Sequence, residues 1–241
     1  MAREVQQDLD RLKTFIENYE IATLLESDDY LAPLKQAHSA YLALLTLWAE
    51  VKYRCDESGI DVCGINIGKG HPSGLLIQEA VSDFGSALFC CLQGAYKPGA
   101  MALRSAIENY VRALAGAFSQ TARTTTSVYE LFELAKTTPP FSSVDGAPAL
   151  SKLHVSYKEL CKHTHTASLD HMARIKSLDH FPTVDPDLFK SWAKEGRLIA
   201  GAIISSFISA AGELYLSSHF RNRDVFDLYL SSDQRLRLVR G

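Results

Sequence analysis

Charged and titratable side chains on two apolar stretches are the residues of this chain that could do chemistry. Arg104, Glu108 and Arg112 recur every four residues, which places them on one stripe of a helix. Tyr157 and His165 lie on a second helical stretch further along the chain. Arginine can hold a phosphate, and histidine can act as an acid or a base near neutral pH. We expect Arg104, Glu108, Tyr157 and His165 to converge between two adjacent helices.

The stripe on the first stretch has two interpretations. As a solvated face it would be a ladder of i,i+4 ion pairs, each contributing ~0.2–0.5 kcal/mol. Its neighbours Ala100, Leu103 and Ala115 are small or apolar, which favours partial burial of Arg104 and Glu108. Buried charges must be paired, so this second interpretation predicts an ion pair between Arg104 and Glu108. The pair would be structural or part of a polar site.

Histidine and carboxylate side chains also gather at His163, His165, Asp170 and His171. Imidazole and carboxylate groups suit zinc, but this spacing matches no common zinc motif. We therefore expect no bound metal and no cofactor.

Composition favours one large domain in a reducing compartment. The chain has 241 residues, of which 46% are hydrophobic, which is ample for a core. Its five cysteines are odd in number and unevenly spaced, so we expect free thiols and a cytoplasmic protein. The first residues carry no apolar signal segment. A net charge of −3 argues against a general nucleic-acid binder but permits a local basic patch.

Apolar residues recur at helical spacing along most of the chain, and no alternating strand pattern is present. The sequence predicts an all-α, up-and-down bundle of about seven helices. Pro98 is placed to open a helix after a tight turn, so the third and fourth helices should be antiparallel neighbours. The helices are expected at residues 3–26, 30–55, 75–92, 94–114, 127–136, 149–163 and 187–220.

Residues 198–216 are apolar with a single charge, Glu213, and approach the length of a membrane span. Small residues such as Gly201 and Ser205 favour close helix packing instead. We expect a buried central or dimer-forming helix, hence a homodimer or a complex with a partner protein, and no membrane.

The predicted organisation has three parts. Residues 1–56 form a helical pair that packs on a bundle at residues 74–220, and residues 221–241 form a basic tail. In that tail, arginines alternate with apolar residues near the C-terminus, which is typical of a strand-like docking segment. A frayed terminus is the alternative.

Two short motifs carry a family resemblance. The first comprises Gly94, Tyr96, Gly99, Ala100, Arg104, Ser105 and Glu108, and the second comprises Tyr157, Leu160, Cys161 and His165. Over roughly residues 75–166, they resemble the HEPN-type domains of prokaryotic conflict and abortive-infection systems. The resemblance implies a compact bundle that usually dimerises. It also implies a metal-independent endoribonuclease with an R-x(4–6)-H motif, although other members are inactive binding or scaffold subunits.

The match to that motif here is Arg174 and His180, with the apolar Ile175 where active members usually have a polar residue. Metal-free RNA cleavage uses the substrate's 2′-OH and needs a general base, a general acid and a cation for the phosphate. His165 or His180 would be the acid or base, and Arg104 or Arg174 would hold the phosphate.

In the same scheme Tyr157 would be an auxiliary donor, and Glu108 would orient its neighbours. We therefore expect an RNA-cleaving or RNA-binding effector subunit of a bacterial anti-phage defence or toxin–antitoxin system. The alternative is a non-catalytic scaffold subunit of a multi-protein defence complex.

Overall fold

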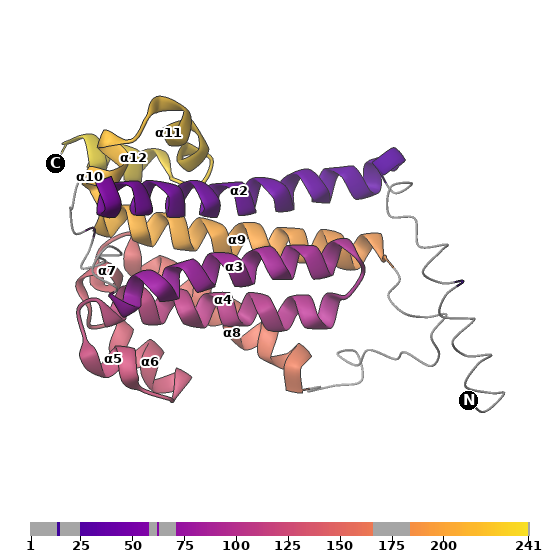
Figure 1. The fold of residues 1–241 in the computed structure, drawn as a ribbon, viewed down its shortest axis with the longest axis horizontal. Coiled ribbons are helices and arrows are strands. Elements are labelled where there is room, and N and C mark those ends of the chain that lie inside the picture. The colour runs from indigo at the N-terminus through magenta and orange to yellow at the C-terminus, as the bar shows by residue number, and fades with distance from the viewer. Residues whose placement is uncertain (1–13, 15–24, 58–61, 63–70, 166–183, 241) are drawn as a thin grey trace.

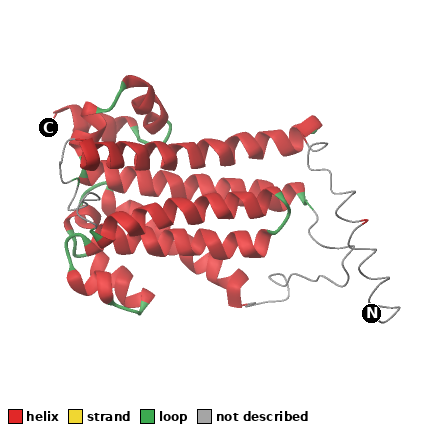
Figure 2. Cartoon of the chain, in the orientation of Figure 1, coloured by secondary structure: helices red, strands yellow, loops and turns green. Residues whose placement is uncertain are grey.

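The described part of the chain is built of helices, as the sequence predicts. The computed structural model describes residue 14, residues 25–57, residue 62, residues 71–165 and residues 184–240. These residues contain eleven helices and no strand, so the all-α fold class is confirmed (Figure 2). The helix expected at residues 3–26 falls almost entirely outside the described part.

Five long helices form a closed ring. They are α2 (Asp28–Glu57), α3 (Pro72–Leu92), α4 (Tyr96–Gly116), α8 (Gly146–His165) and α9 (Pro186–Ala210). Each packs on the next, and α9 closes the ring against α2, although these two helices are distant in the sequence (Figure 1). The helix α4 also contacts α9 across the ring. This arrangement places α4 and α8 side by side.

The turn between α3 and α4 shows why these helices are antiparallel neighbours. Gly94 follows the end of α3 with a φ of 77°, a left-handed conformation that glycine adopts without strain. The Gly94 N–H donates to Cys91 O over 3.1 Å, and the Ala95 N–H donates to Cys90 O over 2.8 Å. This pair of bonds is the Schellman motif, which ends a helix and reverses the chain. The next helix starts at Tyr96, two residues before Pro98.

Gly99 lies where α4 comes closest to α3. A Cβ atom at Gly99 would be 2.5 Å from Cys91 Sγ and 3.2 Å from Ala87 O. Gly99→Ala should therefore lower the free energy of unfolding by ~1–3 kcal/mol, despite the better helix propensity of alanine. Gly201→Ala is the control, because a Cβ there meets only Tyr229 at 3.5 Å. Thermal unfolding in which both variants match the wild type would contradict this close packing.

Three short helices cover one end of α4. These are α5 (Gln120–Thr124), α6 (Val128–Ala135) and α7 (Pro139–Ser142). Ser119 and Ser127 cap the first two by accepting backbone N–H bonds. The α7 turn lies in the stretch between the helices expected at residues 127–136 and 149–163, where the sequence predicts none. Together these helices bring the Thr125 carbonyl and the Phe132 ring to the neighbourhood of α4 and α8.

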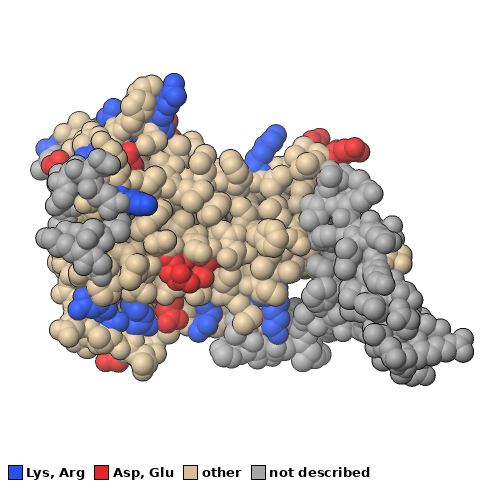
Figure 3. Space-filling model, viewed as in Figure 1, with Lys and Arg blue, Asp and Glu red and all other residues tan. Residues whose placement is uncertain are grey.

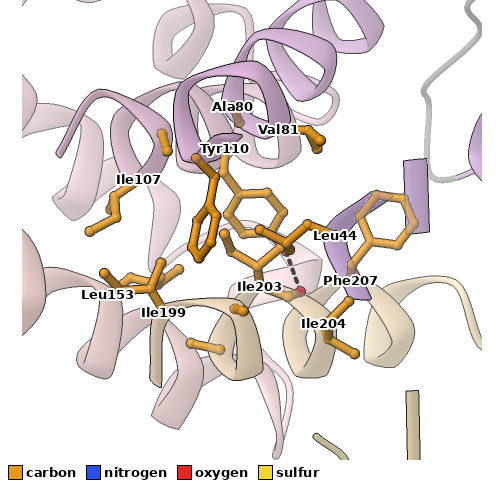
Figure 4. Packing of buried hydrophobic residues seen from close by; sticks show 14 of the residues in the cluster. Leu44, Ala80, Val81, Ile107, Tyr110, Leu153, Ile199, Ile203, Ile204 and Phe207 are labelled. Atoms are coloured by element: carbon orange, nitrogen blue, oxygen red, sulfur yellow. Dashed lines mark hydrogen bonds between the residues drawn. The ribbon is translucent and has the colours of Figure 1, made fainter. Parts of the chain in front are cut away.

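The core lies where the five long helices meet. Buried side chains from all five point inward, among them Leu44 of α2, Val81 of α3 and Leu153 of α8 (Figure 4). Tyr110 of α4 is 1% exposed, so its hydroxyl needs a partner inside the core. It donates to the Ile203 carbonyl of α9 over 3.0 Å and lies 2.7 Å from Ser206 Oγ. This bond fixes α4 against α9 at the centre of the bundle.

The C-terminal fifth of the chain differs from the prediction. The long helix expected at residues 187–220 breaks at Ala211, and α10 (Gly212–Ser217) follows. The backbone of Ala211 leaves the helical conformation, with a φ of −130° and a ψ of 55°. Gly212 then packs close to the last described helix, because a Cβ there would be 3.2 Å from the side chain of Leu238.

The described residues of the tail form α11 (Phe220–Asp227) and α12 (Ser232–Arg240), so the strand-like or frayed segment predicted near the C-terminus is wrong. The alternation of arginines with apolar residues suggested a strand, but the residues that face the bundle are Gln234 and Leu238. They are four residues apart, which is the spacing of a helix.

The small-residue stripe of α9 packs against this C-terminal segment. Ser205 Oγ donates to Gln234 Oε1 over 3.0 Å, and Gln234 Nε2 returns a bond of 2.9 Å to Ser205 O. Gly201 leaves room for the Tyr229 ring. The interpretation of residues 198–216 as one buried helix therefore holds only for residues 198–210, which lie in α9 and use their small residues for packing within the chain. The prediction of a homodimer stays a prediction.

Candidate functional site

A polar seam runs between α4 and α8, and Arg104 lies at its centre. The α4 helix presents Arg104, Glu108 and Arg112 one turn apart, and all three side chains are half-buried. The rest of α4 is apolar toward the core, with Leu103 and Ile107 fully buried. The helix thus positions a charged stripe at the edge of its own buried face, as the sequence predicts.

Arg104 binds two side chains of α8. Its Nη2 donates to the Tyr157 hydroxyl over 2.6 Å, and its Nε donates to Cys161 Sγ over 3.3 Å. The Arg104 Cζ also lies 4.9 Å from the centre of the Tyr157 ring, within range of a cation–π contact. Tyr157 and Cys161 are four residues apart on one face of α8. The predicted convergence of Arg104 with Tyr157 is therefore present.

Glu108 does not pair with Arg104, and this prediction is wrong. Glu108 Oε1 accepts a bond of 3.0 Å from Arg112 Nη2, one turn in the other direction. Arg112 Nη1 also donates to the Thr125 carbonyl over 2.5 Å. The turn before α6 thus holds Arg112 toward Glu108, while α8 supplies Arg104 with other partners. Within the described residues, no carboxylate lies within ion-pair distance of Arg104.

The charge states of the seam follow from these contacts. Burial raises the pKa of the Tyr157 hydroxyl, and the neighbouring Arg104 cation offsets this only in part. Tyr157 is thus a neutral phenol at neutral pH. Burial on its own would lower the pKa of Arg104, but its contacts with Cys161 and Tyr157 outweigh this effect and raise it. Arg104 is therefore a permanent cation, and the phenol of Tyr157 that binds it carries no charge.

His154 is a residue of this site that sequence reasoning missed. It precedes Tyr157 by three positions on α8, and its ring stacks on Phe132 with 4.3 Å between centroids. Phe132 also contacts the Tyr157 ring at 5.7 Å. Burial, followed by the cations Lys158 and Lys136, lowers the pKa of His154, so the imidazole is neutral near pH 7. The sequence did hold a signal for this residue, because the i,i+3 spacing of His154 and Tyr157 places both on one face of a helix.

The other predicted site residues are placed only in part. His165 is the last residue of α8, four positions after Cys161, and its side chain lies outside what the structure describes. Arg174 and His180 lie outside the described residues altogether. No group of three or more potential metal ligands occurs within the described ranges, and most of the histidine cluster near residue 165 lies beyond them.

Comparisons with protein-family models, curated proteins and solved structures gave no match to this chain. Among the described helices, α3 is long and apolar enough to span a membrane by length and composition, and 39% of its apolar window is buried in the bundle.

Proposed function

We propose that this chain is an RNA-binding, RNA-cleaving effector subunit of a bacterial anti-phage defence or toxin–antitoxin system, built on a HEPN-like bundle. One observation carries the proposal: Arg104 is a cation held in place by Tyr157 and Cys161, and no carboxylate of the described residues pairs with it. A half-buried cation is costly unless something pairs with it. An anionic ligand would supply the missing partner.

The geometry suits a phosphate as that ligand. The bonds to Tyr157 and Cys161 use Nη2 and Nε of Arg104 and fix the plane of the guanidinium. Its Nη1 has no hydrogen-bond partner among the described residues, and it is not one of the buried polar atoms that lack a partner. This nitrogen can therefore donate to a ligand. A guanidinium oriented in advance binds a phosphate oxygen with little loss of side-chain freedom.

Further cations follow the same edge of the molecule. Figure 3 shows basic groups, with acidic groups among them, along the lower edge of the molecule. The helices α4 and α5 contribute Lys97, Arg104, Arg112 and Arg123. Arg112 is paired with Glu108, but several cations along one edge are the usual electrostatic footprint of a nucleic-acid backbone. These cations are also the local basic patch that a net charge of −3 permits.

The cleavage step requires an acid and a base beside the bound phosphate. His165 lies on the same side of α8 as Tyr157 and Cys161, eight residues after the first and four after the second. His154 lies on the other side of Tyr157 and is neutral near pH 7, which suits a base. The substrate's own 2′-OH would attack the phosphorus, so the reaction would proceed without a metal ion.

Arg104→Gln tests the binding step. It keeps a polar side chain but removes the charge, so the affinity for single-stranded RNA should fall at least ~10-fold. The slope of log affinity against log salt should also decrease by roughly 0.7, the value of one phosphate contact on a single strand. Fluorescence anisotropy of a labelled oligonucleotide measures both.

Arg221→Gln is the matched control, because Arg221 is exposed on α11, away from α4. It should leave both the affinity and the slope near the wild-type values. If the two variants weaken binding equally, Arg104 has no special role. A wild-type chain that binds no RNA would favour the scaffold subunit.

A further inference from the structure

A second site lies in a cleft between α8, α9 and the segment that joins α11 to α12. The cleft encloses a cavity of about 470 Å³, a size typical of small-molecule sites. Its lining includes Lys152 of α8, Lys194 and Arg197 of α9, and Tyr229 of the joining segment. None of these residues belongs to the polar seam around Arg104.

The charge of this cleft is strongly one-sided. Lys152, Lys194 and Arg197 line it, and none of them forms an ion pair with a carboxylate in the described part of the chain. Asp145 is the acidic residue in the lining, and Arg237 already binds it, with Nη2 2.5 Å and Nε 3.3 Å from its two oxygens. Three cations therefore face the cavity without compensation.

The cations stand on two walls and are partly fixed in place. Lys194 and Arg197 are three residues apart, on the same face of α9, and Lys152 approaches from α8. Arg197 stacks on the Tyr229 ring, with its Cζ 4.9 Å from the ring centre, and donates to Leu228 O over 3.3 Å. The lysines are exposed and can move toward a ligand.

Several of the neutral polar groups at the cleft already have hydrogen-bond partners. Ser205 and Gln234, which both line the cleft, exchange two hydrogen bonds of 3.0 and 2.9 Å. The groups left to bind a ligand are thus mainly the cations, which favour phosphate oxygens. Three cations on two walls exceed the needs of a single phosphate.

We propose that this cleft binds a small oligophosphate, with successive phosphate groups between Lys152 on one wall and Lys194 and Arg197 on the other. The oligophosphate is either free or the tail of a nucleotide, since both present the same chemistry to the cations. The site is separate from the RNA site proposed at Arg104, and its ligand would bind on a different face of α8.

Titration calorimetry of the full chain with inorganic tripolyphosphate tests the proposal. We expect saturable binding at one site, weakened at least ~10-fold in the double variant Lys152→Gln, Lys194→Gln, because each lost charge removes a charge-assisted contact. Lys190→Gln is the matched control, since Lys190 is exposed on α9 and does not line the cleft. ATP in a parallel titration distinguishes the sources: tighter binding than tripolyphosphate indicates a nucleotide.

Arg104→Gln separates the two proposals. It should leave tripolyphosphate binding unchanged, so a failure at one site would not imply a failure at the other. An absence of heat and of any thermal stabilisation at millimolar tripolyphosphate would overturn the cleft proposal. So would a Lys190→Gln variant that binds as weakly as the double variant, because binding would then reflect general charge.

Discussion

Replacing His165 with alanine should lower the rate of RNA cleavage by ~10²–10⁴-fold, the usual effect of removing a general acid or base. Cys161 lies against Arg104, and His165 follows it by one helical turn at the end of α8. This position is the next one along the face that holds the partners of Arg104. Cleavage of a labelled RNA strand under single-turnover conditions measures the loss.

Two further properties of the reaction follow from the 2′-OH nucleophile. Cleavage should persist in a chelator, and a DNA strand of the same sequence should not be cut. His38→Ala is the control for His165→Ala, because His38 is exposed on α2. His180→Ala tests the rival motif outside the described residues. If both His165→Ala and His180→Ala keep the wild-type rate, the assigned sites are wrong.

Phe84→Ala should lower the free energy of unfolding by ~3–5 kcal/mol, the typical effect of emptying a buried aromatic position. Phe84 is fully buried on α3. Its ring lies 6.3 Å from that of Tyr41 on α2 and 6.1 Å from that of Trp192 on α9, measured between centroids. Its loss would leave a cavity where three helices meet. Urea unfolding followed by circular dichroism measures the change.

The control lies on the same helix. Phe89 is 64% exposed, so Phe89→Ala should change the free energy of unfolding by less than about 0.5 kcal/mol. Equal effects at the two positions would contradict the packing of α3. A loss at Phe89 that grows with protein concentration would instead place this residue in a contact between copies of the chain.

The helices near the site were predictable because their local signals agree. Gly94 and Pro98 mark a tight turn, and apolar residues recur at helical spacing along α4 after this turn. Arg104 and Tyr157 could be expected to meet, since both lie on apolar helices that must pack. The sequence therefore predicted the two helices of the seam and the side chain at its centre.

The partner of Glu108 was not predictable, because Arg104 and Arg112 are both four residues away from it. Helical spacing alone cannot choose between them. The choice depends on the Thr125 carbonyl, which binds Arg112, and on Tyr157 and Cys161, which bind Arg104. The last helix, α12, was missed for a similar reason, since the contact that fixes its register, Ser205 with Gln234, joins distant segments.

The closure of the ring by α2 and α9 affects the order in which the protein can be made. During synthesis α2 leaves the ribosome early, but the helix that covers its apolar face is added only after α3 to α8 are complete. The apolar face of α2, which includes the buried Leu44 and Leu47, is therefore covered only in part, by α3, until α9 is made. A nascent chain halted before α9 should remain open to proteases and dependent on chaperones, however well α3 and α4 have already paired.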